Sequence, residues 1–241
     1  MKLNIFNSES EVLTALAEHF VQVAGESIAM KGKFSVALSG GSSPKKLYEM
    51  LASTYHDKVE WEKVHFFFGD ERYVPQTDKD SNFLMVKNAL FVPLMIDYAN
   101  VYPVDTSLPP AEAAAKYDEE IEAFFGDEDI SFDLILLGLG DNSHTASLFP
   151  YTPVLHERTP AVNEVFLPDQ KVYRITLNAP MINEARHIAF LVYGQGKAEA
   201  VHHVLEDDED IEEYPAQLIE PIVGEIQWFL DEAAASLLED K

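Results

Sequence analysis

The segment "FDLILLGLGDNSHTASLFP" (132–150) indicates how this chain folds. An apolar run ends in Gly138-Leu139-Gly140, three short polar residues follow, and then comes His144. A short apolar run bounded by turn residues is typical of a strand buried on both faces, as in a parallel sheet. Open α/β sheets bind their ligands beyond the carboxyl ends of such strands. The segment therefore predicts a ligand site around His144.

Apolar strands that alternate with helical segments predict the rest of the fold. We expect a doubly wound, mostly parallel α/β sheet, flanked by helices in a three-layer, Rossmann-like arrangement. No repeat or biased linker interrupts residues 1–241, which predicts a single domain. The expected strands are 34–38, 64–68, 132–138, 172–177 and 187–194, and the expected helices include 9–28, 44–51, 82–91, 111–125, 196–206 and 226–240.

Composition excludes several classes of protein. The chain has 241 residues, no cysteine and a formal net charge of −25. Disulfides, thiolate zinc sites and cysteine nucleophiles are therefore impossible, and nucleic acids or anionic membranes are unexpected partners. No signal peptide and no apolar run of about 18 residues is visible, so we expect a cytoplasmic protein. The acidic run 206–213 predicts a solvated loop.

The second informative segment is "VALSGGSSPKK" (36–46). A strand is predicted to end at Leu38, and a helix to begin at Pro44, a favoured first helical position. The intervening glycines let the backbone approach a ligand, and a helix N-terminus offers free N–H groups. The sequence allows two interpretations, a phosphate-binding loop and an ordinary turn with a serine cap. The candidate phosphate-binding residues are Ser39, Gly40, Gly41 and Ser42.

Charged residues at other strand ends could complete such a site. Asp70, Glu71 and Arg72 follow the predicted strand 64–68 and form either part of the site or a local group of salt bridges. Arg174 lies in an apolar strand, where an unpaired cation is costly, so it needs a carboxylate or an anionic ligand. Lys197 begins a predicted helix, where its charge opposes the helix dipole unless an anion is also present.

Several chemistries could use His144. It lacks a second histidine at metal-ligand spacing, and the adjacent His202 and His203 point in different directions on a helix, so we expect no metal site. The chain has no G-x-S-x-G nucleophile motif, and the G-x-G-x-x-G dinucleotide motif is incomplete. A general base that activates water remains, because imidazole accepts protons near neutral pH. The competing interpretation is a histidine that only packs or caps the loop.

Six segments resemble the 6-phosphogluconolactonase family in sequence and order. The most specific is His-Thr-Ala-Ser-Leu-Phe-Pro (144–150), and the resemblance covers nearly the whole chain from about residue 34. The segments are "SGGSSPKKLYEML" (39–51), "GDERYVP" (69–75), "DSNFLMVKNALF" (80–91), "LLGLGDNSHTASLFP" (136–150), "RITL" (174–177) and "YPAQLI" (214–219).

The resemblance implies hydrolysis of 6-phospho-D-glucono-1,5-lactone to 6-phosphogluconate in the oxidative pentose phosphate pathway. No metal or organic cofactor is implied, and the fold would be that of glucosamine-6-phosphate deaminases. The partner would be a small sugar phosphate, bound by a monomer or homodimer. Carried over by position, His144 would activate water, and Asp70 and Arg72 would lie near the sugar. The phosphate would lie at Ser39, Gly40, Gly41 and Ser42, with Lys197 and Arg174 as cationic partners.

One departure from the family pattern lies beside the histidine. The family usually reads Gly-x-Gly-x-Asp-Gly-His, and this chain has Asn142-Ser143 in place of the acid and the glycine. Serine tolerates left-handed backbone poorly, which predicts a loop with less of it than the glycine version has. Asp141 lies one residue earlier, and the sequence leaves open which acid, if any, orients His144.

Three alternative functions remain open. Glucosamine-6-phosphate deaminases read His-Ile-Ala-Phe-Asn-Glu-Pro in the matching block, whereas this chain has Leu148 and Phe149 at the asparagine and glutamate positions. Phenylalanine cannot supply the acid–base relay of such an isomerase or deaminase. The altered Asn142-Ser143 pair would suit a non-catalytic sugar-phosphate sensor. A nucleotide-binding oxidoreductase would need the glycine motif that is incomplete here.

Overall fold

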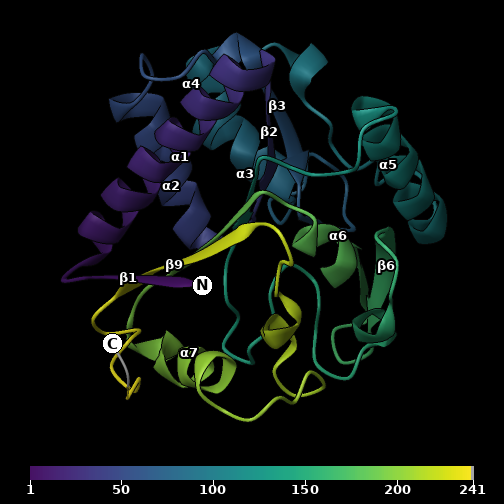
Figure 1. The fold of residues 1–241 in the computed structure, drawn as a ribbon. Coiled ribbons are helices and arrows are strands. Elements are labelled where there is room, and N and C mark those ends of the chain that lie inside the picture. Colours follow the sequence, from purple (N-terminus) through teal and green to yellow (C-terminus); the bar gives the residue numbers. More distant parts are fainter. Residues whose placement is uncertain (240–241) are drawn as a thin grey trace.

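The computed structural model describes residues 1–239 and centres on a six-stranded parallel sheet (Figure 1). Every neighbouring pair in this sheet runs parallel. The chain moves outward in one direction from β2 to β3 and in the other from β5 to β8, so the strand order reverses between β2 and β5. In spatial order the strands are β1 (Lys2–Phe6), β9 (Glu225–Asp231), β8 (His187–Val192), β5 (Leu134–Leu137), β2 (Phe34–Leu38) and β3 (Val64–Phe68).

Helices cover both faces of this sheet, which confirms the predicted three-layer fold. Alternate strand residues face opposite cores: in β5, Leu136 belongs to one buried cluster and Ile135 to the other. The first cluster includes residues of α1 and α2, and the second includes residues of α5, α6 and α7, on the other side of the sheet (Figure 1). The helices are α1 (Glu9–Lys31), α2 (Ser42–Thr54), α3 (Asn82–Val86), α4 (Val92–Leu94), α5 (Pro110–Phe125), α6 (Ala179–Asn183) and α7 (Ala198–Leu205).

A second, antiparallel sheet contains β4 (Asp70–Arg72), β7 (Val172–Leu177) and β6 (Val162–Leu167). The strand predicted over 172–177 is therefore confirmed, but its expected place in the parallel sheet is wrong, and β6 was not predicted. Both strands are partly exposed, so they lack the continuous apolar run of a doubly covered strand. Gly69 joins the sheets, because its N–H donates to Leu38 in β2 and its carbonyl accepts from Leu177 in β7.

The C-terminal segment was predicted as a helix over 226–240, and this prediction is also wrong. Residues 225–231 form β9 between β1 and β8, and residues 232–239 form turns and irregular chain. Asp231 ends the strand, because its carboxylate accepts N–H groups of Gly194 and Ala234. Burial of Trp228 and its neighbours in the sheet outweighs the helix propensity of the alanines that follow. Residue 240 lies outside the described residues.

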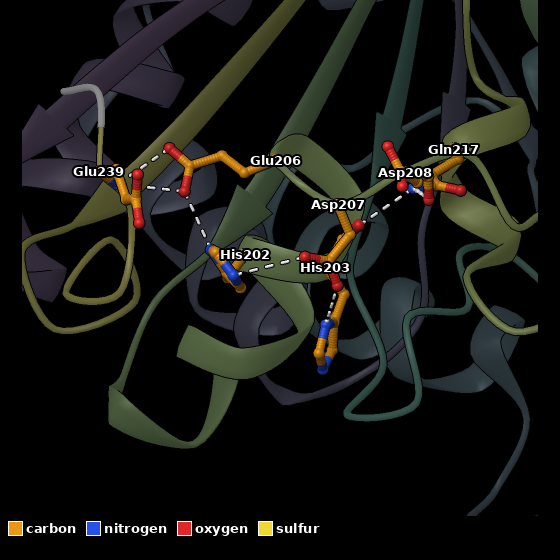
Figure 2. Close-up of polar contacts among 7 residues, drawn as sticks. All are labelled: His202, His203, Glu206, Asp207, Asp208, Gln217 and Glu239. Atoms are coloured by element: carbon orange, nitrogen blue, oxygen red, sulfur yellow. Dashed lines mark hydrogen bonds and ion pairs between the residues drawn. The ribbon is translucent and has the colours of Figure 1, made fainter.

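The acidic run 206–213 is mostly exposed turn and irregular chain, as predicted, and it also makes specific contacts. Glu206 and Asp207 pair with His202 and His203 of α7, and Glu206 also accepts the N–H of Glu239 (Figure 2). The run reaches the loop that holds His144, through a bond from the N–H of Tyr151 to the carbonyl of Glu212. The carbonyl of Ser143 accepts a bond from Ala216 just beyond the run. This segment therefore braces the His144 loop.

No helix among the described residues is long and apolar enough to cross a membrane.

A half-buried histidine on α1 links stability to pH. Within residues 1–239, Nε2 of His19 is buried without a hydrogen-bond partner, and the ring lies 5.4 Å from that of Phe229. Burial, with the nearby His187, lowers the pKa of His19 to about 4, while Glu225 and Glu26 raise it and Lys2 lowers it. An unfolded histidine titrates near 6.5, so between these values the unfolded chain binds more protons and the folded state loses stability as pH falls.

We predict that His19→Phe removes this acid sensitivity. From pH 7 to pH 5, the free energy of unfolding of the unmodified protein should fall by about 1 kcal/mol more than that of the variant, after allowance for the partial exposure of His19. Urea unfolding of both proteins at each pH measures the difference. A difference that stays constant across this range would contradict the prediction.

Candidate active site

The loops that follow β2, β3, β5 and β8 meet at one edge of the main sheet and line a cleft of about 280 Å³. The cleft lies at the carboxyl ends of β2 and β5, where the strand order reverses, which is the usual ligand position in open α/β sheets. Arg174 is the predicted site residue that does not line the cleft. The others that were predicted do: Ser39, Gly40, Gly41, Ser42, Asp70, Arg72, His144 and Lys197.

The loop 39–43 presents an open helix end to the cleft. Gly41 caps α2 with φ 105°, a left-handed conformation that favours glycine, and no side chain caps the helix. A Cβ on Gly40 would lie 1.9 Å from the amide oxygen of Asn82, so glycine is required there as well. The buried Tyr48 fixes the start of the loop, because its hydroxyl bonds both the N–H and the carbonyl of Ser39. Pro44 has no N–H and the N–H of Lys45 bonds the carbonyl of Gly41, so the N–H groups of Ser42 and Ser43 are left for a ligand.

Asp70 is largely buried and ties two site loops together. Its carboxylate accepts bonds from Ser147 Oγ at 2.7 Å and from Asn82 Nδ2 at 3.2 Å. Ser147 lies in the His144 loop, so Asp70 links β4 to that loop. Arg72 also lines the cleft, and its guanidinium donates to the carbonyl of Asp80 at 3.2 Å.

A local group of salt bridges was the alternative prediction for residues 70–72, but Glu71 instead accepts hydrogen bonds from backbone N–H groups. It is 1% exposed, and its carboxylate accepts the N–H groups of Arg72, Asn82 and Phe83 at 2.7–2.8 Å. Burial raises its pKa to about 7, although these backbone bonds lower it. Glu71 therefore holds the backbone at Arg72 and at Asn82 in place. It does not itself line the cleft.

Phe149 and Gly140 pack closely against the ring of His144. The ring of Phe149 stacks on it, with centroids 4.1 Å apart and planes 20° from parallel. Gly140 also lies close to the ring. A Cβ at this position would lie 2.0 Å from Nδ1 of His144, so only glycine leaves room for the ring. Nδ1 lies 2.5 Å from the side-chain oxygen of Asn142. The imidazole is therefore fixed in place before any ligand binds.

Cations surround His144 in a protein that is otherwise strongly acidic. Burial lowers the pKa of His144 to about 4, with further lowering by Lys197, Arg174 and Arg72 and an opposing effect of Asp141. Arg174 faces Arg72 as its register partner across β7 and β4, and burial and Arg72 lower the pKa of Arg174. Like charges at facing positions are unfavourable in a sheet unless an anion lies between them. The site is therefore suited to an anionic ligand.

Lys197 is positioned by an acid of the His144 loop. Its ammonium lies 2.5 Å from the carboxylate of Asp141, and its side chain is 30% exposed. Asp141 was considered as a substitute for the acid that the family places beside the histidine. In the structure Asp141 pairs with Lys197, and Asn142 contacts His144.

The backbone of the His144 loop corrects one prediction. Ser143 replaces the family glycine and was expected to reduce left-handed backbone, yet it has φ 59°. Two hydrogen bonds hold it there, one from its N–H to Gly140 and one to its carbonyl from Ala216. The loop therefore keeps the left-handed conformation and carries the strain that glycine would avoid.

Tyr193, Thr145 and Ala146 also line the cleft and were not predicted from the sequence. Tyr193 follows β8 directly, and burial raises its pKa while Ser43 of the glycine–serine loop lowers it. Its position at the end of a buried strand was the available signal. Among residues 1–239 no group of three or more His, Asp or Glu side chains has the arrangement of a metal site.

Comparison with known proteins identifies relatives of this chain. A family model described as glucosamine-6-phosphate isomerases/6-phosphogluconolactonase matches residues 7–228. A 6-phosphogluconolactonase from Synechocystis is 42% identical over 88% of each chain, and one from Nostoc is 41% identical over 88% of this chain and 87% of the relative.

Solved structures show the same fold. A 6-phosphogluconolactonase from Trypanosoma cruzi superposes with a TM-score of 0.87 and 28% identity, covering 99% of this chain and 97% of that one. A monomeric glucosamine-6-phosphate deaminase has a TM-score of 0.82 at 20% identity, covering 99% of this chain and 100% of that one, which shows a shared fold alone. The chain belongs to the glucosamine-6-phosphate isomerase/6-phosphogluconolactonase family.

Proposed function

We propose that this chain is a 6-phosphogluconolactonase, which hydrolyses 6-phospho-D-glucono-1,5-lactone to 6-phospho-D-gluconate in the oxidative pentose phosphate pathway. The names of its relatives support this reaction. The observation that carries the proposal is a single cleft that contains a fixed imidazole, His144, and an open helix end, residues 39–43. We further propose that residues 1–241 act as one catalytic domain, because both buried clusters pack on the same sheet.

The phosphate group of the substrate would bind at residues 39–42. The free N–H groups of the first turn of α2 and the positive end of its dipole suit a phosphate. Lys197 lines the same cleft and would add a positive charge, exchanging part of its contact with Asp141 for the phosphate. This remote binding energy would orient the lactone ring toward His144.

His144 would then act as a general base. Its neutral imidazole takes a proton from water as the water oxygen bonds to the lactone carbonyl carbon. The carbonyl oxygen becomes an oxyanion, which the nearby cations and loop N–H groups stabilise. The tetrahedral intermediate collapses with cleavage of the bond to the ring oxygen, and the imidazolium returns its proton to that oxygen. The product acid ionises, and the imidazole is neutral again.

Phe149 argues against the deaminase alternative. Its ring lies flat against His144, at the position where deaminases of this fold have the glutamate of their acid–base relay. An apolar ring cannot move protons, but it fixes and desolvates the imidazole. This environment suits a lone base that acts on water.

We predict that His144→Asn lowers kcat about 100- to 10,000-fold, the usual contribution of a general base, with a small change in KM. The assay uses freshly generated lactone, with the spontaneous rate subtracted, and circular dichroism to check that the variant folds. Near-normal turnover by the folded variant would show that His144 is not the base.

We predict that His144 stays neutral in mildly acidic solution. Because burial and the surrounding cations lower its pKa to about 4, the free protein should keep the basic imidazole from pH 7 down to about pH 5. Nitrogen NMR of histidine-labelled protein measures the titration, and the resonance missing from His144→Asn assigns it. A midpoint at or above 6.5 would refute the prediction.

We predict that Lys197→Ala raises KM for the phosphorylated lactone about 10- to 100-fold, as expected for loss of a charge-assisted contact. The KM for glucono-1,5-lactone, which has no phosphate, should change much less. Lys58→Ala removes an exposed lysine paired with Asp57 and serves as the matched control. Equal effects of Lys197→Ala on both substrates would remove Lys197 from the phosphate site.

A further inference from the structure

The residue that contacts the edge of His144 is a neutral amide. Nδ1 of the ring lies 2.5 Å from Oδ1 of Asn142, two residues earlier in the same loop. An amide oxygen can only accept a hydrogen bond, so this contact requires the proton of the neutral imidazole to be on Nδ1. Nε2 is then the unprotonated, basic nitrogen.

Other contacts fix the plane of the ring but not the position of its proton. Phe149 stacks on one face, and Gly140 approaches so closely that a Cβ there would overlap the ring. Neither of them exchanges a hydrogen bond with a ring nitrogen. The choice between the two tautomers is left to Asn142.

The charged groups that face His144 come from several elements. Lys197, Arg174 and Arg72 lie beyond β8, in β7 and in β4, and each disfavours the protonated ring. Asp141, in the same loop, favours it, and its carboxylate is already paired with Lys197. A carboxylate at position 142 would add a negative charge at the ring itself, and the asparagine adds none.

We propose that Asn142 is a positioning residue that holds His144 as the Nδ1–H tautomer, with Nε2 as the base, without adding negative charge beside it. The effect on catalysis rests on the proposed lactone hydrolysis, whereas the effect on the tautomer does not. The sequence pattern of the family has an acid here, so the neutral orienting group is a property of this chain.

Two substitutions separate orientation from charge. Asn142→Ala removes the acceptor, so the imidazole should populate both tautomers, and kcat should fall about 10- to 100-fold with KM within threefold. Asn142→Asp keeps an acceptor and adds charge, so the Nδ1–H tautomer and most of kcat at pH 8 should be retained. Its titration midpoint should rise by at least about one pH unit, as for a histidine beside a carboxylate.

Nitrogen NMR of histidine-labelled free protein reads the tautomer and the midpoint, and lactone hydrolysis from pH 5 to pH 8 reads kcat and KM. Asn100→Ala is the control, because Asn100 bonds the carbonyl of Glu62 away from the cleft. It should leave all four readouts unchanged.

Protonation of Nε2 in the unmodified protein would overturn the proposal. An unchanged tautomer in Asn142→Ala would do the same, and a changed tautomer with unchanged kcat would remove the positioning role in catalysis. If the unmodified protein hydrolyses no lactone, the proposed function fails while the NMR result still decides the tautomer. Wild-type-like circular dichroism of each variant confirms that the comparison concerns folded protein.

Discussion

The position of β5 between β2 and β8 determines where the candidate site forms. Parallel strands end at the same edge of a sheet, so this order brings the loop 39–43, the loop that holds His144 and the segment that holds Lys197 side by side. These segments are more than 150 residues apart along the chain at their extremes, and no local contact could assemble them. The buried hydrogen-bonded core of the sheet therefore fixes the distances on which the proposed chemistry depends.

The electrostatics of the cleft oppose those of the molecule. The chain carries a net charge of −25, yet two arginines and a lysine act on His144. Screening limits the influence of distant surface charge to about 8 Å at physiological salt, so the local cations dominate within the cleft. The arrangement of these cations is electrostatically unfavourable in one respect, because Arg72 and Arg174 face each other across a sheet. Asp70, Glu71 and Asp80 offset part of that repulsion.

The sequence predicts the parts of this structure that depend on local pattern. The buried strands β2, β3, β5 and β8 are visible as apolar runs, and the loops after them contain the candidate site residues. β1, β4, β6 and β9 were not predicted. β1 and β6 are partly exposed and have no continuous apolar run, β4 is a short charged segment, and β9 precedes an alanine-rich segment with high helix propensity. The roles of Asn142, Phe149 and Glu71 depend on contacts that only the folded loop creates. Their residue types alone do not indicate them.

Gly69 lies at the junction between the parallel and the antiparallel sheet. The glycine bonds β2 of the parallel sheet and β7 of the antiparallel sheet, and the cleft lies where these sheets meet. Insertions or exchanges in the smaller sheet can therefore alter what faces the imidazole while the loop 39–43 stays intact. A protein with this arrangement can acquire new reactions through changes in the residues on one side of the cleft. A monomeric glucosamine-6-phosphate deaminase shares this fold at 20% identity.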